Sequence, residues 1–194
     1  MVRSGYINVK VYRGIGLETS ILFAREGASV LMADISEPDL QAAITKVKTV
    51  VPDAVRLQAI KCDVSRESDV QAMIEKLDSW GGCDVIFNNA GIMHKEDADA
   101  IDTPEKIWDM TQNVNVKGVW YGSKHAVLSM RRHNKTKGSI INTASFVALM
   151  GSGTPQLAYT ASKGAVLAMT RELAITHARE GFRFNSLCPG PLKY

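Results

Sequence analysis

A tyrosine and a lysine, Tyr159 and Lys163, stand four positions apart in the segment YTASK. On a helix, this spacing places both side chains on one face. A phenol with an ordinary pKa of about 10 is a poor base near neutral pH, but an adjacent lysine ammonium stabilises the phenolate. The pair could therefore pass a proton to or from a hydroxyl or carbonyl oxygen. Because the same spacing is common on solvated helix faces, the surrounding residues decide between the two interpretations.

Two further polar residues could serve the same chemistry. Ser145 follows a short apolar run, where its hydroxyl could bond the same substrate oxygen. Asn115 lies in the run NVNVKG, inside a segment of helical periodicity and just before Gly118, a glycine that would let a neighbouring element come close. A mid-helix asparagine is more commonly a tolerated polar residue. Asn115, Ser145, Tyr159 and Lys163 are thus the candidate catalytic residues.

A pair of glycines near the start of the chain could hold a phosphate. In VKVYRGIGLETS, Gly14 and Gly16 lead into a segment of helical periodicity, and a helix N-terminus with exposed N–H groups binds anions. The residues in front of this pair, Lys10 to Arg13, stand where a nucleotide-binding loop would have a glycine turn. A side chain in such a turn carries a steric cost if the backbone needs a positive φ. The alternative is a chance coincidence of two glycines.

Asp34 stands 18 positions after Gly16, close to the distance of about 20 at which an acidic residue meets the ribose of a bound dinucleotide. A carboxylate there accepts hydrogen bonds from a 2′-hydroxyl and repels a 2′-phosphate, which favours NAD over NADP. The alternative is an aspartate that caps a helix after a strand. Arg13 is a counter-indication, because a basic residue in this loop can meet a 2′-phosphate.

The elements that must position these residues alternate along the chain. We predict helices over residues 16–26, 38–51, 68–80, 104–132 and 157–179, and strands over 28–33, 55–64, 85–87, 139–142 and 182–187. Ile7, Val9 and Val11 alternate with other residues, which favours a half-exposed first strand over a buried central one. The alternation predicts an α/β fold, a Rossmann-like doubly wound parallel sheet with helices on both faces, in a single domain over residues 1–194. Ligands bind beyond the carboxyl ends of such strands, where the candidate residues stand.

Composition narrows the class of protein. The chain has 194 residues, 45% of them apolar, and a net charge of +3, which is too small to indicate nucleic acid as a partner. The three cysteines show no CxxC spacing and the four histidines no ligand spacing, so we expect neither disulfides nor a metal site. No apolar run is long enough to span a membrane, and no secretory signal opens the chain. These features predict a cytoplasmic protein.

Eight short motifs, taken together, resemble the short-chain dehydrogenase/reductase family. They stand in the order of the family and at about its spacing, from Gly14 to the end of the chain. They are GIG at 14–16, ADI at 33–35, CDV at 62–64, NNAG at 88–91, NVKG at 115–118, INTAS at 141–145, YTASK at 159–163 and NSLCPGP at 185–191. Each motif is weak by itself, but eight in register make coincidence very improbable.

The resemblance implies an oxidoreductase that moves a hydride between NAD(P), with NAD preferred, and a secondary alcohol or ketone. Tyr159 would be the general acid or base, Lys163 would stabilise the phenolate and hold the nicotinamide ribose, and Ser145 would orient the substrate oxygen. Asn115 would help to fix a water in a proton relay to Lys163. The cofactor-binding residues implied are Gly14, Ile15, Gly16, Asp34, Asp63, Val64, Asn89, Ala90, Gly91, Tyr159, Lys163, Pro189 and Gly190.

The two ends depart from the family pattern. Members usually carry TGxxxGxG, whose first glycine falls here at Lys10, and they continue beyond the stretch that ends here at Tyr194. We therefore expect a sheet that is incomplete at its C-terminal edge, weak NAD binding and slow turnover. The alternative function is a catalytically impaired, truncated family member that acts only as a binding or oligomerising module, associating through its two long helices. Trp108, Trp120 and Tyr121 are predicted to lie in the core or at such a subunit interface.

Overall fold

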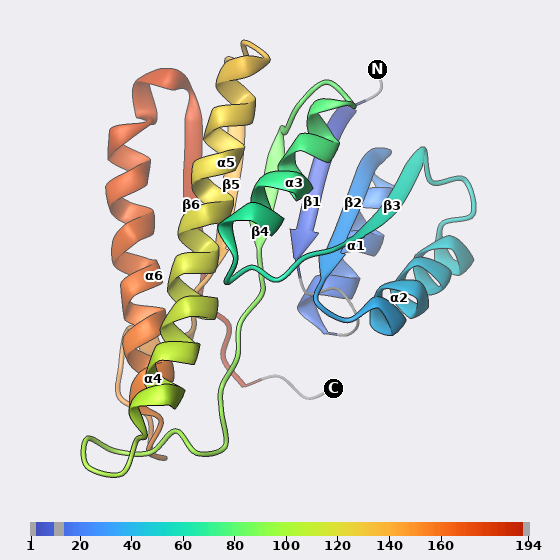
Figure 1. The fold of residues 1–194 in the computed structure, drawn as a ribbon. Coiled ribbons are helices and arrows are strands. Elements are labelled where there is room, and N and C mark those ends of the chain that lie inside the picture. The colour runs from blue at the N-terminus through green and yellow to red at the C-terminus, as the bar shows by residue number, and fades with distance from the viewer. Residues whose placement is uncertain (1–2, 10–13, 192–194) are drawn as a thin grey trace.

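The computed structural model, which describes residues 3–9 and 14–191, is built on one parallel β-sheet (Figure 1). Within these ranges the sheet has six strands in the order β3-β2-β1-β4-β5-β6. They are β1 (Arg3–Val9), β2 (Ala28–Asp34), β3 (Arg56–Lys61), β4 (Val85–Asn88), β5 (Gly138–Thr143) and β6 (Phe182–Leu187). The strand order reverses between β1 and β4, and doubly wound sheets bind ligands at such a switch point. The predicted fold class is confirmed.

Helices cover both faces of the sheet. They are α1 (Ile15–Arg25), α2 (Glu37–Val50), α3 (Glu67–Asp78), α4 (Glu105–Gln112), α5 (Gly118–Arg132) and α6 (Leu157–Thr176). Alternate residues of β2 show which helix lies on which face. Val30 and Met32 pack against α1 and α2, whereas Leu31 and Ala33 join a core with α3 and α5. None of the helices in the described ranges is both long and apolar enough to cross a membrane.

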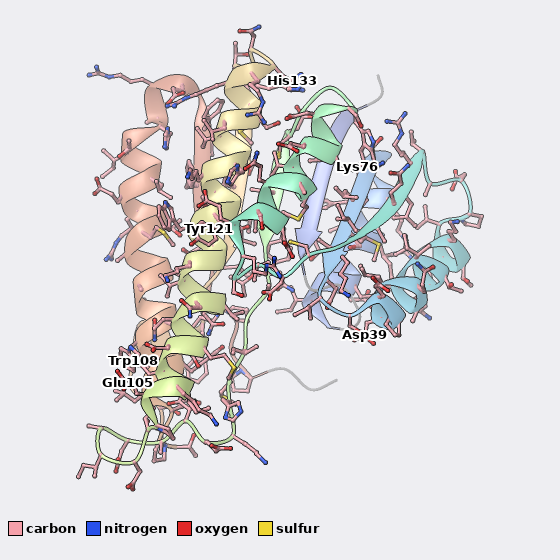
Figure 2. All side chains as sticks on the ribbon, viewed as in Figure 1. Asp39, Lys76, Glu105, Trp108, Tyr121 and His133 are labelled. Atoms are coloured by element: carbon pink, nitrogen blue, oxygen red, sulfur yellow. The ribbon has the colours of Figure 1, made fainter. Side chains whose placement is uncertain are left out.

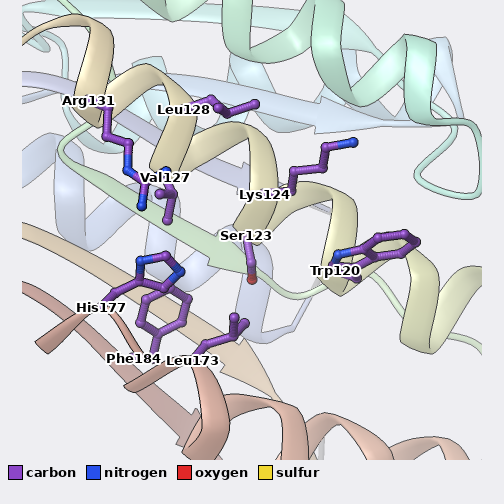
Figure 3. A pocket seen from close by; sticks show the side chains of 9 residues that line it. All are labelled: Trp120, Ser123, Lys124, Val127, Leu128, Arg131, Leu173, His177 and Phe184. Carbon is purple, nitrogen blue, oxygen red and sulfur yellow. The ribbon is translucent and has the colours of Figure 1, made fainter. Parts of the chain in front are cut away.

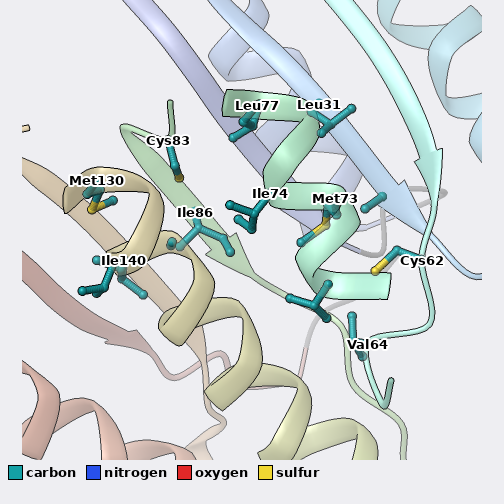
Figure 4. Close-up of a cluster of buried hydrophobic side chains, with 14 of the residues drawn as sticks. Leu31, Cys62, Val64, Met73, Ile74, Leu77, Cys83, Ile86, Met130 and Ile140 are labelled. Atoms are coloured by element: carbon teal, nitrogen blue, oxygen red, sulfur yellow. The ribbon is translucent and has the colours of Figure 1, made fainter. Parts of the chain in front are cut away.

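The larger core lies between the sheet and the helices α3 and α5 (Figure 4). Leu31 of β2, Ile86 of β4 and Ile140 of β5 supply the sheet side, and all three are fully buried. Ile74 of α3 and Met130 of α5 meet them from the helices. Burial of side chains this large stabilises a fold by about 1.5–3 kcal/mol each. This core packs against the strands whose carboxyl ends carry the candidate residues.

The first strand differs from its predicted position. β1 lies at the centre of the sheet, where Ile7 pairs with Leu31 of β2 on one side and with Ile86 of β4 on the other. The preference for a half-exposed strand over a central one was therefore wrong. Strand position is decided by backbone hydrogen bonding to segments far away in the sequence, which a local alternation of residue types does not encode. The predicted strand residue Val11 lies outside the described residues.

The predicted helix over 104–132 is divided into three parts. α4 ends at Gln112, a π-helical segment follows over Asn113–Lys117, and α5 begins at Gly118. Single π-helical turns inside α-helices are frequent at functional sites. This one contains Asn115, which is fully buried. The π-helical segment is only five residues long, so it barely disturbs the helical spacing of apolar residues. That spacing therefore predicted one continuous helix.

Two other predicted elements are shorter in the structure. The strand predicted over 55–64 is confined to Arg56–Lys61, and the helix predicted over 157–179 ends at Thr176. A 3-10 turn over Ala178–Glu180 follows that helix and ends at Gly181, whose φ of 78° suits glycine. Arg131 of α5 binds Glu180 through two bonds of 2.7 and 2.8 Å. Its guanidinium lowers the pKa of Glu180 to about 2, with a smaller contribution from His177.

Candidate active site

A cavity of about 200 Å³ opens where β2, β3 and β4 end. Its wall is made by the last residue of β2, by residues that follow the three strands, and by one residue of the π-helical segment. They are Asp34, Ile35, Cys62, Asp63, Val64, Ala90, Gly91, Ile92 and Val114. Five of the residues predicted to bind a cofactor, namely Asp34, Asp63, Val64, Ala90 and Gly91, thus share one cavity. Segments far apart in the chain meet there because carboxyl ends of parallel strands share one edge of the sheet.

The two carboxylates of the cavity are oriented by local turns. Asp34 is only 8% exposed, and its Oδ1 accepts a hydrogen bond of 3.1 Å from the N–H of Ser36. Asp63 Oδ1 accepts bonds from the N–H and the hydroxyl of Ser65, at 3.0 and 2.7 Å. The N-cap of α2 is Ser36, whose Oγ accepts the N–H of Asp39. The helix-capping alternative for Asp34 is therefore wrong, and its carboxylate lies in the cavity wall.

The Cys62 thiol adds an apolar patch to the same wall. Burial raises its pKa to about 12, and the nearby carboxylates of Asp69 and Asp63 act in the same direction. A thiol with this pKa stays protonated at physiological pH and is a poor nucleophile or metal ligand. Among the described residues, no group of three or more His, Cys, Asp or Glu side chains could hold a metal ion.

The predicted phosphate loop is described from Gly14 onward. Gly14 has φ 65° and ψ −144°, a backbone conformation essentially confined to glycine, and it is the N-cap residue of α1. Its carbonyl accepts the N–H of Glu18 at 3.1 Å, which starts the helix. Ile15 and Gly16 form the first turn, and Gly16 is buried. Lys10 to Arg13, the residues predicted to disturb the loop, lie outside the described residues.

Tyr159 and Lys163 lie on one face of α6, as their spacing predicts. The Lys163 Nζ is 5.6 Å from the centre of the Tyr159 ring. Lys163 is only 3% exposed, and its Nζ donates a bond of 2.7 Å to the carbonyl of Thr143 at the end of β5. A buried ammonium needs such a partner, because burial of an unpaired charge is costly. Tyr159 is half-buried, so its ring can be reached from solution.

Asn115 binds two other parts of the site from the π-helical segment. Its Oδ1 accepts the N–H of Ile92 at 2.8 Å, and its Nδ2 donates to the Ile92 carbonyl at 2.9 Å. Nδ2 also donates to Ser162 Oγ on α6 at 2.9 Å. Asn115 thus holds the backbone that follows NNAG in a fixed place beside α6. The interpretation as a merely tolerated helical asparagine is wrong for this position.

Gly91 joins the cavity to the catalytic candidates. A Cβ atom at this position would lie 3.2 Å from Lys163 Nζ and 3.4 Å from Asn115 Oδ1. A larger residue here would therefore crowd the Lys163 ammonium, while the distance to Asn115 is an ordinary van der Waals contact. Because Gly91 also lines the cavity, the cavity lies next to Lys163 of the Tyr159–Lys163 pair.

The remaining predicted residues follow β4, β5 and β6. Ser145 is buried and precedes a 3-10 turn, Phe146–Ala148, whose first N–H donates to the carbonyl of Pro189 at 3.1 Å. Ser145 and the Pro189–Gly190 segment are thus neighbours. Asn89 accepts a bond of 3.2 Å from the hydroxyl of Thr143, on the β5 side of its strand. Asn89 therefore supports the strand ends, and the three residues after it, Ala90, Gly91 and Ile92, form this part of the cavity wall.

Sequence reasoning missed Asp97, a buried carboxylate in the loop between β4 and α4 that bonds the first turn of α6. Asp97 stands in the acidic run KEDADAID, which has the composition of a solvated loop. No spacing relates it to α6, whose first turn lies some sixty positions further on. The contact exists only in the folded chain.

Comparison with known proteins assigns the family. A family model described as enoyl-(acyl carrier protein) reductase matches residues 9–194. The chain is 38% identical over 178 residues to 3beta-hydroxysteroid dehydrogenase 2 of Eggerthella lenta, covering 91% of this chain and 66% of that protein. The chain therefore spans about two thirds of the length of this relative.

Two crystal structures share the fold. A short chain dehydrogenase from Mycobacterium smegmatis superposes with a TM-score of 0.89 at 27% identity, over 99% of this chain and 79% of that one. NAD+-bound xylitol dehydrogenase gives a TM-score of 0.88 at 28% identity, over 96% of this chain and 70% of that one. With the family model matching nearly the whole chain, the resemblance seen in the eight motifs is confirmed, and the chain belongs to the short-chain dehydrogenase/reductase family.

Proposed function

We propose that this protein is an oxidoreductase that transfers a hydride between NAD and a secondary alcohol or ketone. One observation carries the proposal: Gly91, which lines the cavity at the strand ends, lies beside the side chains of Lys163 and Asn115. A cofactor held in that cavity would extend past Gly91 to the Tyr159–Lys163 pair. Proton transfer and cofactor binding would then take place in one continuous site.

The residues of the site fit a dinucleotide. Asp34 offers a carboxylate for ribose hydroxyls, and Val64, Ala90 and Val114 offer apolar surface for an adenine ring. Gly14 gives α1 an N-terminus whose backbone only glycine adopts easily, which suits binding of a pyrophosphate. Asp63 and Asn89 hold the surrounding turns, and Pro189 and Gly190 would lie near the nicotinamide. When bound, NAD supplies the hydride acceptor and NADH the hydride donor.

The chain itself would supply position and proton transfer. The Tyr159 phenol exchanges a proton with the substrate oxygen, and the Lys163 ammonium stabilises the phenolate. Ser145 donates a hydrogen bond to the same oxygen. Asn115 holds the segment at Ile92 and the α6 residue Ser162 in register. The water relay from Asn115 to Lys163 stays a prediction.

The similar proteins support this substrate class. One relative is a hydroxysteroid dehydrogenase and one structural neighbour is a xylitol dehydrogenase with NAD+ bound. Hydroxysteroids and xylitol are both alcohols. We infer a small-molecule alcohol or ketone as the substrate of this chain as well.

We place the reaction in the cytoplasm. The described cysteines Cys62, Cys83 and Cys188 are free thiols, and the first two are buried. Sparse unpaired cysteines are typical of a reducing compartment. Burial raises the pKa of Cys83, which keeps it unreactive in the folded protein.

NADH is expected to bind at least about tenfold more tightly than NADPH. A hydrogen bond to a charged group contributes about 1.5–3 kcal/mol, and tenfold in affinity corresponds to about 1.4 kcal/mol. Asp34 would accept such a bond from the 2′-hydroxyl and repel a 2′-phosphate. The measurement is a titration of cofactor fluorescence, with Asp34→Ala expected to narrow the gap. Asp39→Ala is the matched control. Asp39 is a second carboxylate in the first turn of α2, and it does not line the cavity.

Equal affinities for the two cofactors would refute the role of Asp34. If neither cofactor binds while the protein is folded, the proposed reaction is refuted. That second outcome would leave the alternative function, an oligomerising module.

An exposed apolar surface favours self-association as a second property. A groove of about 250 Å³ lies between α5 and α6 (Figure 3). On α5, Trp120 is 47% exposed beside it, and Leu128 lines it further along. Trp108 on α4 and Tyr121 on α5 continue the same column of helices (Figure 2). Trp108 is also partly exposed, so of the two predicted positions for the tryptophans, core or subunit interface, their exposure favours the interface. We infer that a second copy of the chain covers this groove.

Trp120→Glu is expected to shift the protein from dimer or larger to monomer, because a carboxylate at the centre of an apolar interface would be buried without a partner. The molar mass is measured by light scattering over a range of concentrations. Leu22→Glu is the control, since Leu22 is an exposed apolar residue of α1 on the opposite face of the sheet. A monomeric unmodified chain would contradict the inference.

A further inference from the structure

The first turn of α6 is bonded from outside the helix. α6 begins at Leu157, and the first N–H groups of a helix have no partner within it. The loop between β4 and α4 supplies the missing acceptors. Leu157 N–H donates to the carbonyl of Ala98 at 2.9 Å. Ala158 N–H donates to Oδ1 of Asp97 at 2.9 Å, and Tyr159 N–H donates to Oδ2 at 2.8 Å.

Asp97 is built into this position. Its side chain is only 8% exposed, and both carboxylate oxygens are used on α6. Thr103 steadies the loop, because its Oγ1 accepts the N–H of Ala98 at 3.0 Å and approaches Asp97 Oδ1 at 3.5 Å. A negative charge at a helix N-terminus is favourable, and hydrogen bonds to an ionised carboxylate are stronger than neutral ones. A second link comes from Gln112 of α4, whose Nε2 donates to the carbonyl of Ala158 at 3.0 Å.

We propose that Asp97 is a positioning residue that sets the place of the Tyr159 phenol against Lys163. Tyr159 is the third residue of α6, in the turn that frays first when a helix loses its cap. Lys163 stands one turn further in, and its Nζ is bonded separately to Thr143. Loss of the cap would therefore displace Tyr159 while Lys163 stays. A displacement of about 1 Å in a catalytic group can cost about 10²-fold in rate.

A carboxylate is specifically required by the two N–H donors. Asparagine has only one acceptor oxygen. Its NH₂ group, which is a donor, would therefore point at the second backbone N–H, which is also a donor. Asp97→Asn therefore loses one bond and creates a repulsive contact without changing the size of the side chain. Asp97→Glu keeps two acceptor oxygens on a longer arm and should restore part of the effect.

The same loop offers a matched control. Asp99 stands two residues away, and its Oδ1 accepts the N–H groups of Ile101 and Asp102 at 2.9 and 3.0 Å. These bonds lower the pKa of Asp99, so it is also an ionised carboxylate that bonds backbone N–H groups. Its bonds stay within the loop. Both use the same oxygen, so Asp99→Asn removes a carboxylate charge from this loop while an amide oxygen can still accept both bonds, and α6 is not touched.

The first test does not depend on turnover. The full chain is labelled with 13C-tyrosine, and the Tyr159 resonance is assigned from its loss in Tyr159→Phe. Asp97→Asn should shift this resonance and speed amide hydrogen exchange over residues 157–160, while residues 166–176 keep their protection. Asp99→Asn should change neither. An unshifted resonance with unchanged exchange in Asp97→Asn would overturn the proposal; if that variant does not fold, Asp97→Glu is judged by the same criteria.

The second test rests on the proposed oxidoreductase function. Asp97→Asn should lower kcat by about tenfold or more, with the Kd for NADH unchanged, and Asp97→Glu should recover part of the loss. A shifted resonance with unchanged kcat would overturn the positioning role. If the unmodified chain has no turnover at all, the proposed function fails, and the resonance and exchange measurements alone decide the role of Asp97.

Discussion

Replacing Tyr159 by phenylalanine is expected to lower kcat for ketone reduction by about 10²–10⁴-fold, the usual contribution of a positioned general acid or base. The substitution removes the hydroxyl that would exchange a proton with the substrate oxygen. It keeps the ring, whose centre lies 5.6 Å from Lys163 Nζ. The fold should therefore persist, because Tyr159 is half-buried and its packing is retained. The loss of NADH absorbance with a simple ketone measures the rate.

The matched control for this prediction is Tyr121→Phe. Tyr121 is a half-buried tyrosine of α5 whose ring lies 5.1 Å from that of Trp120, away from the cavity at the strand ends. Its hydroxyl can be removed without touching the proposed proton transfer, so the rate should stay close to that of the unmodified chain. Cofactor titrations should give the same Kd for both variants. If Tyr159→Phe keeps most of its activity, Tyr159 is not the proton-transfer residue.

Asn115→Leu is expected to lower the free energy of unfolding by about 2–4 kcal/mol, the cost of leaving buried polar groups unpaired. Leucine has a similar size but cannot bond the N–H and carbonyl of Ile92, at 2.8 and 2.9 Å, or the hydroxyl of Ser162. Asn115 is fully buried, so water cannot take its place without rearrangement. Each unpaired buried group costs about 1–3 kcal/mol. Because Ile92 is only half-buried, water can partly solvate its N–H and carbonyl, and we therefore expect a value in the lower part of the range for two groups.

Urea unfolding measures this loss, and NADH titration should show weaker binding in the same variant. Binding weakens because Asn115 holds the segment of Gly91 and Ile92, both of which line the cavity. Asn113→Leu is the control, since Asn113 stands in the same π-helical segment. Within the described residues, the Asn113 side chain makes none of these bonds. Equal stability of the two variants would show that the Asn115 bonds contribute nothing net.

The two predictions separate the two kinds of residue in the site. Tyr159→Phe should affect the rate and leave the unfolding free energy nearly unchanged. Asn115→Leu should affect stability and cofactor binding first, and the rate as a consequence. A protein in which both variants lost only stability would be a family member that kept the fold without the chemistry.

Much of this fold could be predicted from the chain because the signals are local. The residues of β2 form a mostly apolar run that ends at Asp34, and a strand that is buried on both faces needs such a run. Tyr159 and Lys163 share a face because four residues make about one helical turn. Asp34, Asp63 and Gly91 were placed near a ligand because each follows an apolar run, and parallel strands end at one edge. Each of these inferences uses residues close together in sequence.

Tertiary structure alone decided the features that depend on distant partners. β1 became central through pairing with β2 and β4, the π-helical turn brought Asn115 to Ile92, and Asp97 reached α6 across the molecule. The sequence by itself determined which residues can donate, accept or carry charge, and which face of an element they share. Which partners those groups meet is decided only when the chain folds, because each pairing must satisfy buried N–H and C=O groups from different segments at once.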